Sequence, residues 1–235
     1  MKKNEGGFTL IELMIATALV SIIVAVIYSA YNVQTKIYTE QDKTAEMQQN
    51  IRAGMVRLQH DLRMAGYNSL HASGAACGGL NKPGIHNATA PTIGFSMDMN
   101  NDGDCADSGE NITYSLYTDA DGIKKLGRAA PVANQPVAEN IAEMDFLYLL
   151  QDSGGNRTQS RTPGGADLEN IVGVQVSLLA RARDDDRKTP AASSFTLAIP
   201  PWGAATPAKT WAFNDSNRYR LLTTIINCRN LGLLK

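Results

Sequence analysis

The longest apolar stretch of the chain lies close to its N-terminus, from Phe8 to Tyr31. Its polar residues are few: Thr9, Glu12, Thr17, Ser21 and Ser29. About 20 apolar residues suffice for a helix to cross a bilayer, so this stretch is long enough to do so. It has no soluble core to cover, and we therefore expect it to be buried in lipid or among other helices.

The apolar pattern continues beyond Tyr31 at helical spacing, with charged residues on the opposite face. The apolar positions are Val33, Ile37, Met47, Ile51, Met55, Leu58, Leu62 and Ala65. No proline interrupts this pattern, Gly54 is its one internal weak point, and Gly66 is a natural stop. The pattern predicts one helix of about 60 residues, from Phe8 to Ala65, whose second half faces the core of a folded domain.

Short runs typical of β-strands follow Gly66, separated by turn residues. They are Thr92–Met97, Ile112–Tyr117, Ile123–Arg128, Met144–Leu150, Ile171–Ala180, Ser194–Ile199 and Arg218–Cys228. The run from Ile171 is partly apolar on both faces, which predicts a strand between the helix and another layer. The predicted fold class is α+β, an antiparallel sheet packed on the distal half of one long helix.

The residues before the apolar stretch indicate where the chain is cut and how it is oriented. A secretory signal peptide has its small cleavage-site residues after the apolar core, whereas Gly6 and Gly7 come before it. Lys2 and Lys3 place this flank in the cytoplasm by the positive-inside rule, and the chain after Tyr31 outside it. Ionisable residues on membrane helices are costly and rare, so Glu12 is a candidate functional residue.

The residues Gly7-Phe8-Thr9-Leu10-Ile11-Glu12 resemble the N-terminal motif of type IV pilins and pseudopilins. The resemblance implies that a prepilin peptidase cuts after Gly7 and methylates the new terminus at Phe8. It also implies that Glu12 meets the terminal amine of a neighbouring subunit during assembly. The charges are compatible with this pairing, because cleavage creates a cationic amine one helical turn from the Glu12 carboxylate. An ordinary membrane anchor with one tolerated acid is the alternative.

On this resemblance the chain divides into four parts. They are a leader at 1–7, a membrane-spanning and assembly half of the helix at 8–31, an amphipathic half at 32–66, and a β-rich periplasmic or extracellular domain at 67–235. The length agrees with one compact domain plus an appended helix.

Four further segments look like those of the PilW-type minor pilins. They are Asp61–Tyr67, Val137–Ile141, Tyr219-Arg220 and Cys228-Arg229-Asn230. The resemblance implies a subunit that helps initiate pilus assembly for adhesion or motility, first in the inner membrane and then in the pilus. Its implied partners are major and minor pilins, through the N-terminal helix, and the inner-membrane assembly platform. The alternative for the whole chain is a J-type pseudopilin of type II secretion. For the segment with Asp61 and Arg63, the alternative is simply a helix end with solvated charges.

Three cysteines lie in the part predicted to be outside the cytoplasm, where disulfides persist. Cys77 and Cys105 both lie in glycine-rich, loop-like sequence, which favours a bond between them, worth roughly 3–4 kcal/mol in the chain-entropy model. Cys228 is then a free and buried thiol. Pairing of Cys77 or Cys105 with Cys228 is the alternative.

One loop carries a candidate calcium site. Oxygen-bearing side chains lie at alternate positions ahead of Gly103, and two more follow it; the candidate ligands are Asp98, Asn100, Asp102, Asp104 and Asp107. Calcium takes six to eight oxygen ligands, and the order Asp-x-Asn-x-Asp-Gly resembles a calcium loop. Gly109 stands where an EF-hand has glutamate, with Glu110 one residue later. The alternative is an acidic, solvated turn.

Other functional classes find little support. The formal net charge is −1 and basic residues are offset by acids, so no nucleic-acid partner is expected. His60, His71 and His86 lack metal-ligand spacing, and neither a nucleophile elbow nor a phosphate-loop lysine occurs, so an enzyme is not expected. The charged run around residues 184–186 predicts an exposed loop. Trp202 and Trp211 are expected to serve packing.

Overall fold

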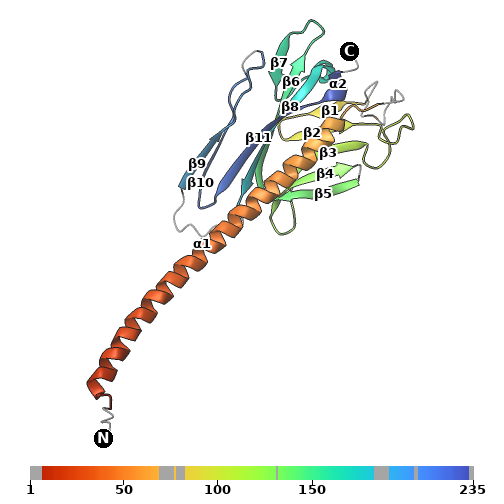
Figure 1. Ribbon diagram of the computed structural model, residues 1–235. Coiled ribbons are helices and arrows are strands. Elements are labelled where there is room, and N and C mark those ends of the chain that lie inside the picture. Colours follow the sequence, from red (N-terminus) through yellow and green to blue (C-terminus); the bar gives the residue numbers. More distant parts are fainter. Residues whose placement is uncertain are drawn as a thin grey trace, which may run out of the picture. The chain divides into compact units, whose positions relative to one another are not determined.

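The computed structural model describes residues 7–68, 77, 83–130, 132–182, 191–203 and 206–232. The leader residues before Gly7, His71 and the acidic run at 184–186 lie outside the described residues. The chain divides into two units, Met1–Ala45 and Glu46–Lys235. Figure 1 shows one long helix, α1 (Leu10–Met64), followed in sequence by a β-rich domain.

In the first unit, the described chain is almost wholly helical and unburied. Every described side chain from Gly7 to Asp42 is exposed. Among the described residues, α1 is the one helix that is long and apolar enough to cross a membrane, by length and composition. This agrees with the prediction of a membrane-spanning first half.

In the second unit, the last turns of α1 bury one face in the core. The buried apolar residues of this face are Met47, Ile51, Met55, Leu58 and Leu62. The helix ends at Met64, and Gly66 then adopts a φ of +76°, the left-handed conformation that commonly closes a helix. The predicted ends, Phe8 and Ala65, lie within two residues of the observed ones.

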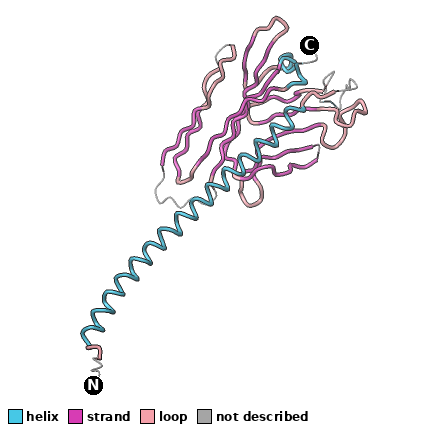
Figure 2. The backbone as a smooth tube through the Cα atoms, viewed as in Figure 1, coloured by secondary structure: helices cyan, strands magenta, loops and turns pink. Residues whose placement is uncertain are grey.

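The strands form three antiparallel sheets, shown in magenta in Figure 2. The five-stranded sheet has the order β1 (Ile85–Ala88), β2 (Thr92–Ser96), β3 (Asn111–Thr118), β4 (Lys124–Ala130), β5 (Val132–Glu139). The four-stranded sheet has the order β11 (Tyr219–Asn227), β8 (Ile171–Arg181), β6 (Ile141–Gln151), β7 (Arg157–Ser160). A hairpin pairs β9 (Ala191–Thr196) with β10 (Thr210–Asp215), and the short helices are η2 (Gly165–Asn170) and α2 (Arg229–Gly232).

One core joins α1 to both larger sheets. It contains Leu58 of α1, Tyr114 of β3 and Val176 of β8. The opposite face of β8 is buried too, because Leu179 packs with Leu197 and Trp211 on the hairpin side. The prediction that this strand lies between the helix and another layer is confirmed, as is the packing role of Trp211.

The predicted α+β fold, a long helix packed on antiparallel strands, is confirmed, but the strands divide among three sheets instead of one. All seven predicted runs form strands, but β1, β5, β7 and β10 were not predicted. Pro136 lies within β5, which is tolerated because β5 is an edge strand. β1 and β7 have four residues each, too few for an alternating pattern to be recognised.

Gly54 is buried where α1 meets the sheets. A Cβ there would lie 2.9 Å from the Cβ of Ala138 and 3.3 Å from Cδ2 of Leu126. The Cβ of Ala138 cannot move without its strand, so we expect Gly54→Ala to destabilise the domain by about 1 kcal/mol despite its better helix propensity. Chemical unfolding of the full chain in detergent measures this change.

The matched control is Ala53→Gly, on the exposed face of the same turn. This variant is expected to lower the free energy of unfolding by about 1 kcal/mol through helix propensity alone. If propensity decided both positions, Gly54→Ala would instead be more stable than the wild type, and that result would contradict the close packing.

Candidate assembly site

The N-terminus of α1 is closed by reciprocal hydrogen bonds between Thr9 and Glu12. Oε2 of Glu12 accepts from the backbone N of Thr9 and from its Oγ1, both at 2.9 Å. The backbone N of Glu12 donates to Oγ1 of Thr9 at 3.3 Å. This is a capping box, which satisfies N–H groups that the first helical turn leaves unpaired. It begins the helix at Leu10 and turns the Glu12 carboxylate back towards the N-terminus.

Thr9 is a capping residue that positions Glu12, and the sequence interpretation missed it. The signal was present, because a threonine followed three positions later by glutamate, ahead of an apolar run, is the pattern of a capping box.

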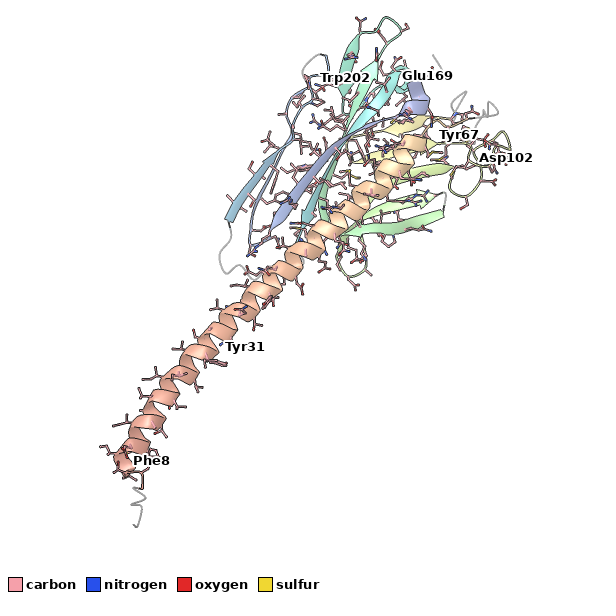
Figure 3. All side chains as sticks on the ribbon, in the orientation of Figure 1. Phe8, Tyr31, Tyr67, Asp102, Glu169 and Trp202 are labelled. Atoms are coloured by element: carbon pink, nitrogen blue, oxygen red, sulfur yellow. A yellow bond between two sulfur atoms is a disulfide. The ribbon has the colours of Figure 1, made fainter. Side chains whose placement is uncertain are left out.

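Glu12 is the only acidic or basic residue between Phe8 and Thr35. Within the described residues, no basic side chain forms an ion pair with it. Figure 3 shows the side chains of this stretch, from Phe8 to Tyr31, standing out around the helix, and Phe8 is 91% exposed. The site is thus a single carboxylate near the start of an apolar helix, held by its hydrogen bonds to Thr9 and without a counter-charge among the described residues. It can accept a hydrogen bond from a cation supplied by another molecule.

In the folded domain, Asp61 joins the last turns of α1 to the five-stranded sheet. Its side chain is buried, and its Oδ2 accepts from Nε of Arg128 at 2.7 Å and from the hydroxyl of Tyr114 at 2.8 Å. Nδ1 of His60 lies 3.1 Å from Oδ1. Burial acts to raise the pKa of Asp61, but the hydrogen bonds from Arg128, Tyr114 and His60 lower it below its ordinary value.

The alternative of solvated charges at this helix end is therefore wrong for Asp61. The Arg63 side chain is exposed, so a solvated charge describes this residue correctly. The carbonyl of Arg63 accepts a hydrogen bond from Nδ2 of Asn230 at 3.2 Å, which ties the C-terminal segment to the end of α1.

The acidic loop between β2 and β3 is held by two buried carboxylates. Asp98 accepts from the backbone N of Asn101 at 2.7 Å and of Gly103 at 3.3 Å. Glu110 accepts from the backbone N of Met99 at 2.8 Å and of Asp107 at 3.3 Å. Glu110 was not among the predicted site residues, yet it holds both ends of the loop.

The other predicted calcium ligands lie on the exposed side of this loop. Nδ2 of Asn100 donates to Asp102 at 2.9 Å and to Asp107 at 2.6 Å, so these three side chains come together. Asp104 instead accepts from the backbone N of Ala106 at 2.7 Å. Among the described residues, no group of three or more His, Cys, Asp or Glu side chains is placed to hold a metal ion. The structure does not test calcium binding, but the hydrogen bonds within the loop favour the alternative of an acidic, solvated turn.

A thermal unfolding experiment tests the calcium site. The loop already satisfies its own N–H groups, so we expect millimolar calcium to change the unfolding midpoint of the full chain by less than about 1 °C. The same scan in EDTA provides the reference. A rise of several degrees, absent after Asp102→Asn, would establish the site and contradict the self-contained loop.

The predicted disulfide between Cys77 and Cys105 is present, with the two sulfurs 2.00 Å apart. It connects the segment after α1 to the acidic loop. Cys228 is free and fully buried at the end of β11, as predicted. Burial raises the pKa of its thiol to about 12.

Comparisons with known proteins match two parts of the chain to family models. Residues 2–28 match the prokaryotic N-terminal methylation motif. Residues 107–230, over half of the chain, match the type IV pilus-assembly protein W family. Among solved structures, a type IV-like pilin from Thermus thermophilus is similar, with a TM-score of 0.46 and 15% sequence identity over 78% of this chain and 96% of that chain. No curated protein sequence matches the chain.

Proposed function

The chain belongs to the type IV pilus-assembly protein W family, and from this premise we propose that it is a minor pilin that helps initiate or promote pilus assembly. It carries the prokaryotic N-terminal methylation motif of pilins. Pilins are structural proteins that interact with other pilins and with the assembly machinery, so we propose that this chain is not an enzyme.

The first step of the proposed function is processing by a prepilin peptidase. Cleavage after Gly7 and methylation of Phe8 are supported by the position of this bond. Residues 7–9 precede the first helical turn and are exposed, so a peptidase can reach this part of the chain without unwinding a helix. The apolar half of α1 stays in the mature chain, because it follows the cut.

The observation that carries the proposal is the lone carboxylate of Glu12. Cleavage creates a cationic amine at Phe8, next to the capping residue Thr9. When apolar helices bundle, Glu12 is removed from water and needs a positive partner. The terminal amine of a neighbouring pilin supplies one, so helix packing and charge pairing select the same alignment of subunits.

Two features support the proposed location, which is the inner membrane before assembly and the pilus afterwards. Lys2 and Lys3 favour a cytoplasmic leader. The disulfide between Cys77 and Cys105 is of a kind that persists outside the cytoplasm. The proposed partners are the prepilin peptidase, the major and other minor pilins, and the inner-membrane assembly platform.

Mass spectrometry of filaments sheared from the cell surface tests the proposal. We expect a peptide that begins at methylated Phe8 in the sheared fraction. The same peptide confined to the cell envelope would instead favour a J-type pseudopilin of a type II secretion filament or an initiator that stays at the base of the pilus. An uncut leader in both fractions would overturn the processing step.

A further inference from the structure

Strand β11 forms one edge of the four-stranded sheet, and half of its backbone groups point away from that sheet. It has nine residues and pairs with β8 without a register shift, from Tyr219 opposite Arg181 to Asn227 opposite Gly173. The bonds that continue the ladder join Ala182 to Arg218 and Cys228 to Val172. In an antiparallel pair, hydrogen-bonded positions alternate. Even-numbered residues of β11 therefore bond to β8.

The outward-facing N–H and C=O groups belong to the odd-numbered residues. These are Tyr219, Leu221, Thr223, Ile225 and Asn227. Within the described residues, no backbone group bonds to them. The edge thus presents a regular row of donors and acceptors over nearly the whole strand.

The other edges of the two larger sheets are protected. β5 contains Pro136, which has no N–H to donate. β1 is four residues long and interrupted by a register shift after Ile85. β7 is covered by the segment that follows β9: Oγ1 of Thr206 donates to the carbonyl of Gln159 at 3.0 Å, and Gly203 is so close that a Cβ would overlap the carbonyl of Arg157.

β11 has none of these protective features. It contains neither proline nor lysine, and the side chain of Ile225 is 48% exposed beside the edge. A long, apolar, unprotected edge is a template for pairing with another chain, which proteins normally avoid. Three protected edges beside one open edge indicate that the open edge is covered by a partner.

The charge around β11 indicates the chemistry of that partner. Arg220 lies in the strand and Arg229 follows it, residues 216–232 contain no acidic residue, and the nearest acid in sequence, Asp215, already accepts from the hydroxyl of Tyr219. A second copy of β11 would bring the same positive charges to the edge. An extended segment with acidic side chains would complement them.

We propose that the outer edge of β11 binds an extended, acidic segment of a different pilin subunit, which adds a strand to the four-stranded sheet. This inference rests on the proposed function, because it places the partner in the same filament. It adds a contact between folded domains to the packing of N-terminal helices. Backbone hydrogen bonds supply the affinity, and the arginines select the partner.

Ile225→Pro tests the proposal, because it removes an outward N–H and leaves the bonds to β8 in place. Proline is tolerated at such an edge position. We expect the ratio of mature chain in sheared filaments to that in the envelope to fall about ten-fold, through the lost hydrogen bond and the obstructing ring. The matched control is Ile225→Val, which keeps the N–H and is expected to behave as the wild type.

Ile225→Glu serves as a second variant, since it keeps the backbone intact and brings a negative charge against the acidic side chains of the proposed partner. It is expected to lower the ratio in the same direction, with an unchanged unfolding midpoint. A photo-crosslinking residue at position 225 in the full chain should yield a crosslinked peptide from another pilin. Crosslinks to this chain alone, or none, would overturn the proposed partner.

The two proposals fail in distinguishable ways. If both variants reach wild-type levels in filaments that contain methylated Phe8, the edge proposal is wrong and the minor-pilin proposal stands. If the wild-type chain itself is absent from filaments and its leader is uncut, the minor-pilin proposal fails regardless of the variants.

Discussion

Replacing Glu12 by glutamine is expected to leave the chain inserted in the membrane and cleaved after Gly7, but to lower its content in sheared filaments about ten-fold or more. Glutamine retains the capping hydrogen bonds to Thr9, because glutamate and glutamine both serve at this position of a capping box. It lacks only the negative charge. Quantitative mass spectrometry of the sheared and envelope fractions measures the effect.

Two further substitutions separate capping from charge. Glu12→Ala removes both, and its filament content should match that of Glu12→Gln. Thr9→Ala removes the cap but keeps the carboxylate, at a cost of about 1 kcal/mol to the first turn. Its filament content should remain within about two-fold of wild type. Normal incorporation of Glu12→Gln would leave Glu12 with a capping role only and remove the charge-pairing argument.

Asp61→Asn is expected to destabilise the folded domain by about 3 kcal/mol, because it leaves the Arg128 guanidinium without its counter-charge in a nearly buried site. The Asp61 and Arg128 side chains are 5% and 13% exposed. Chemical unfolding of the full chain in detergent measures the loss. Glu143→Gln is the control, since Glu143 pairs with Lys124 where the side chains are 36% and 41% exposed. Glu143→Gln should lower the free energy of unfolding by about 0.5 kcal/mol. Equal losses in the two variants would contradict the conclusion that Asp61 joins α1 to the five-stranded sheet.

The effect of Asp61 should also depend on pH. Its pKa in the folded chain lies below the ordinary value of 3.8, so its stabilising contribution is complete above that value and is lost as the pH falls through the lowered pKa. The difference in unfolding free energy between wild type and Asp61→Asn should therefore be largest near about pH 7 and smaller near about pH 3. A difference that grows on acidification would show that another group dominates.

The helix, the doubly buried strand and the disulfide were predictable because each leaves a local signal. Apolar spacing gave the ends of α1 within two residues, and apolar residues on both faces marked β8 as enclosed. The N-terminal motif could be recognised from the sequence for the same reason, because its residues are contiguous.

The buried contacts of Asp61 were not predictable, because its partners are distant in sequence. Tyr114 and Arg128 lie 53 and 67 residues away. Nothing around Asp61 distinguishes it from a solvated aspartate near a helix end. Division of the strands among three sheets has a similar cause, since pairing depends on which edges meet in the fold and not on the composition of each strand.

The buried thiol of Cys228 bears on how the chain acquires the correct disulfide. The protein has three cysteines, so one thiol stays unpaired beside the disulfide. Exchange requires an accessible thiolate, and a thiol with a pKa of about 12 inside the core provides almost none. Once the end of β11 has docked, we therefore expect Cys228 to be unable to attack the bond between Cys77 and Cys105. Incorrect pairing with Cys228 is then expected only before this end of the strand is buried.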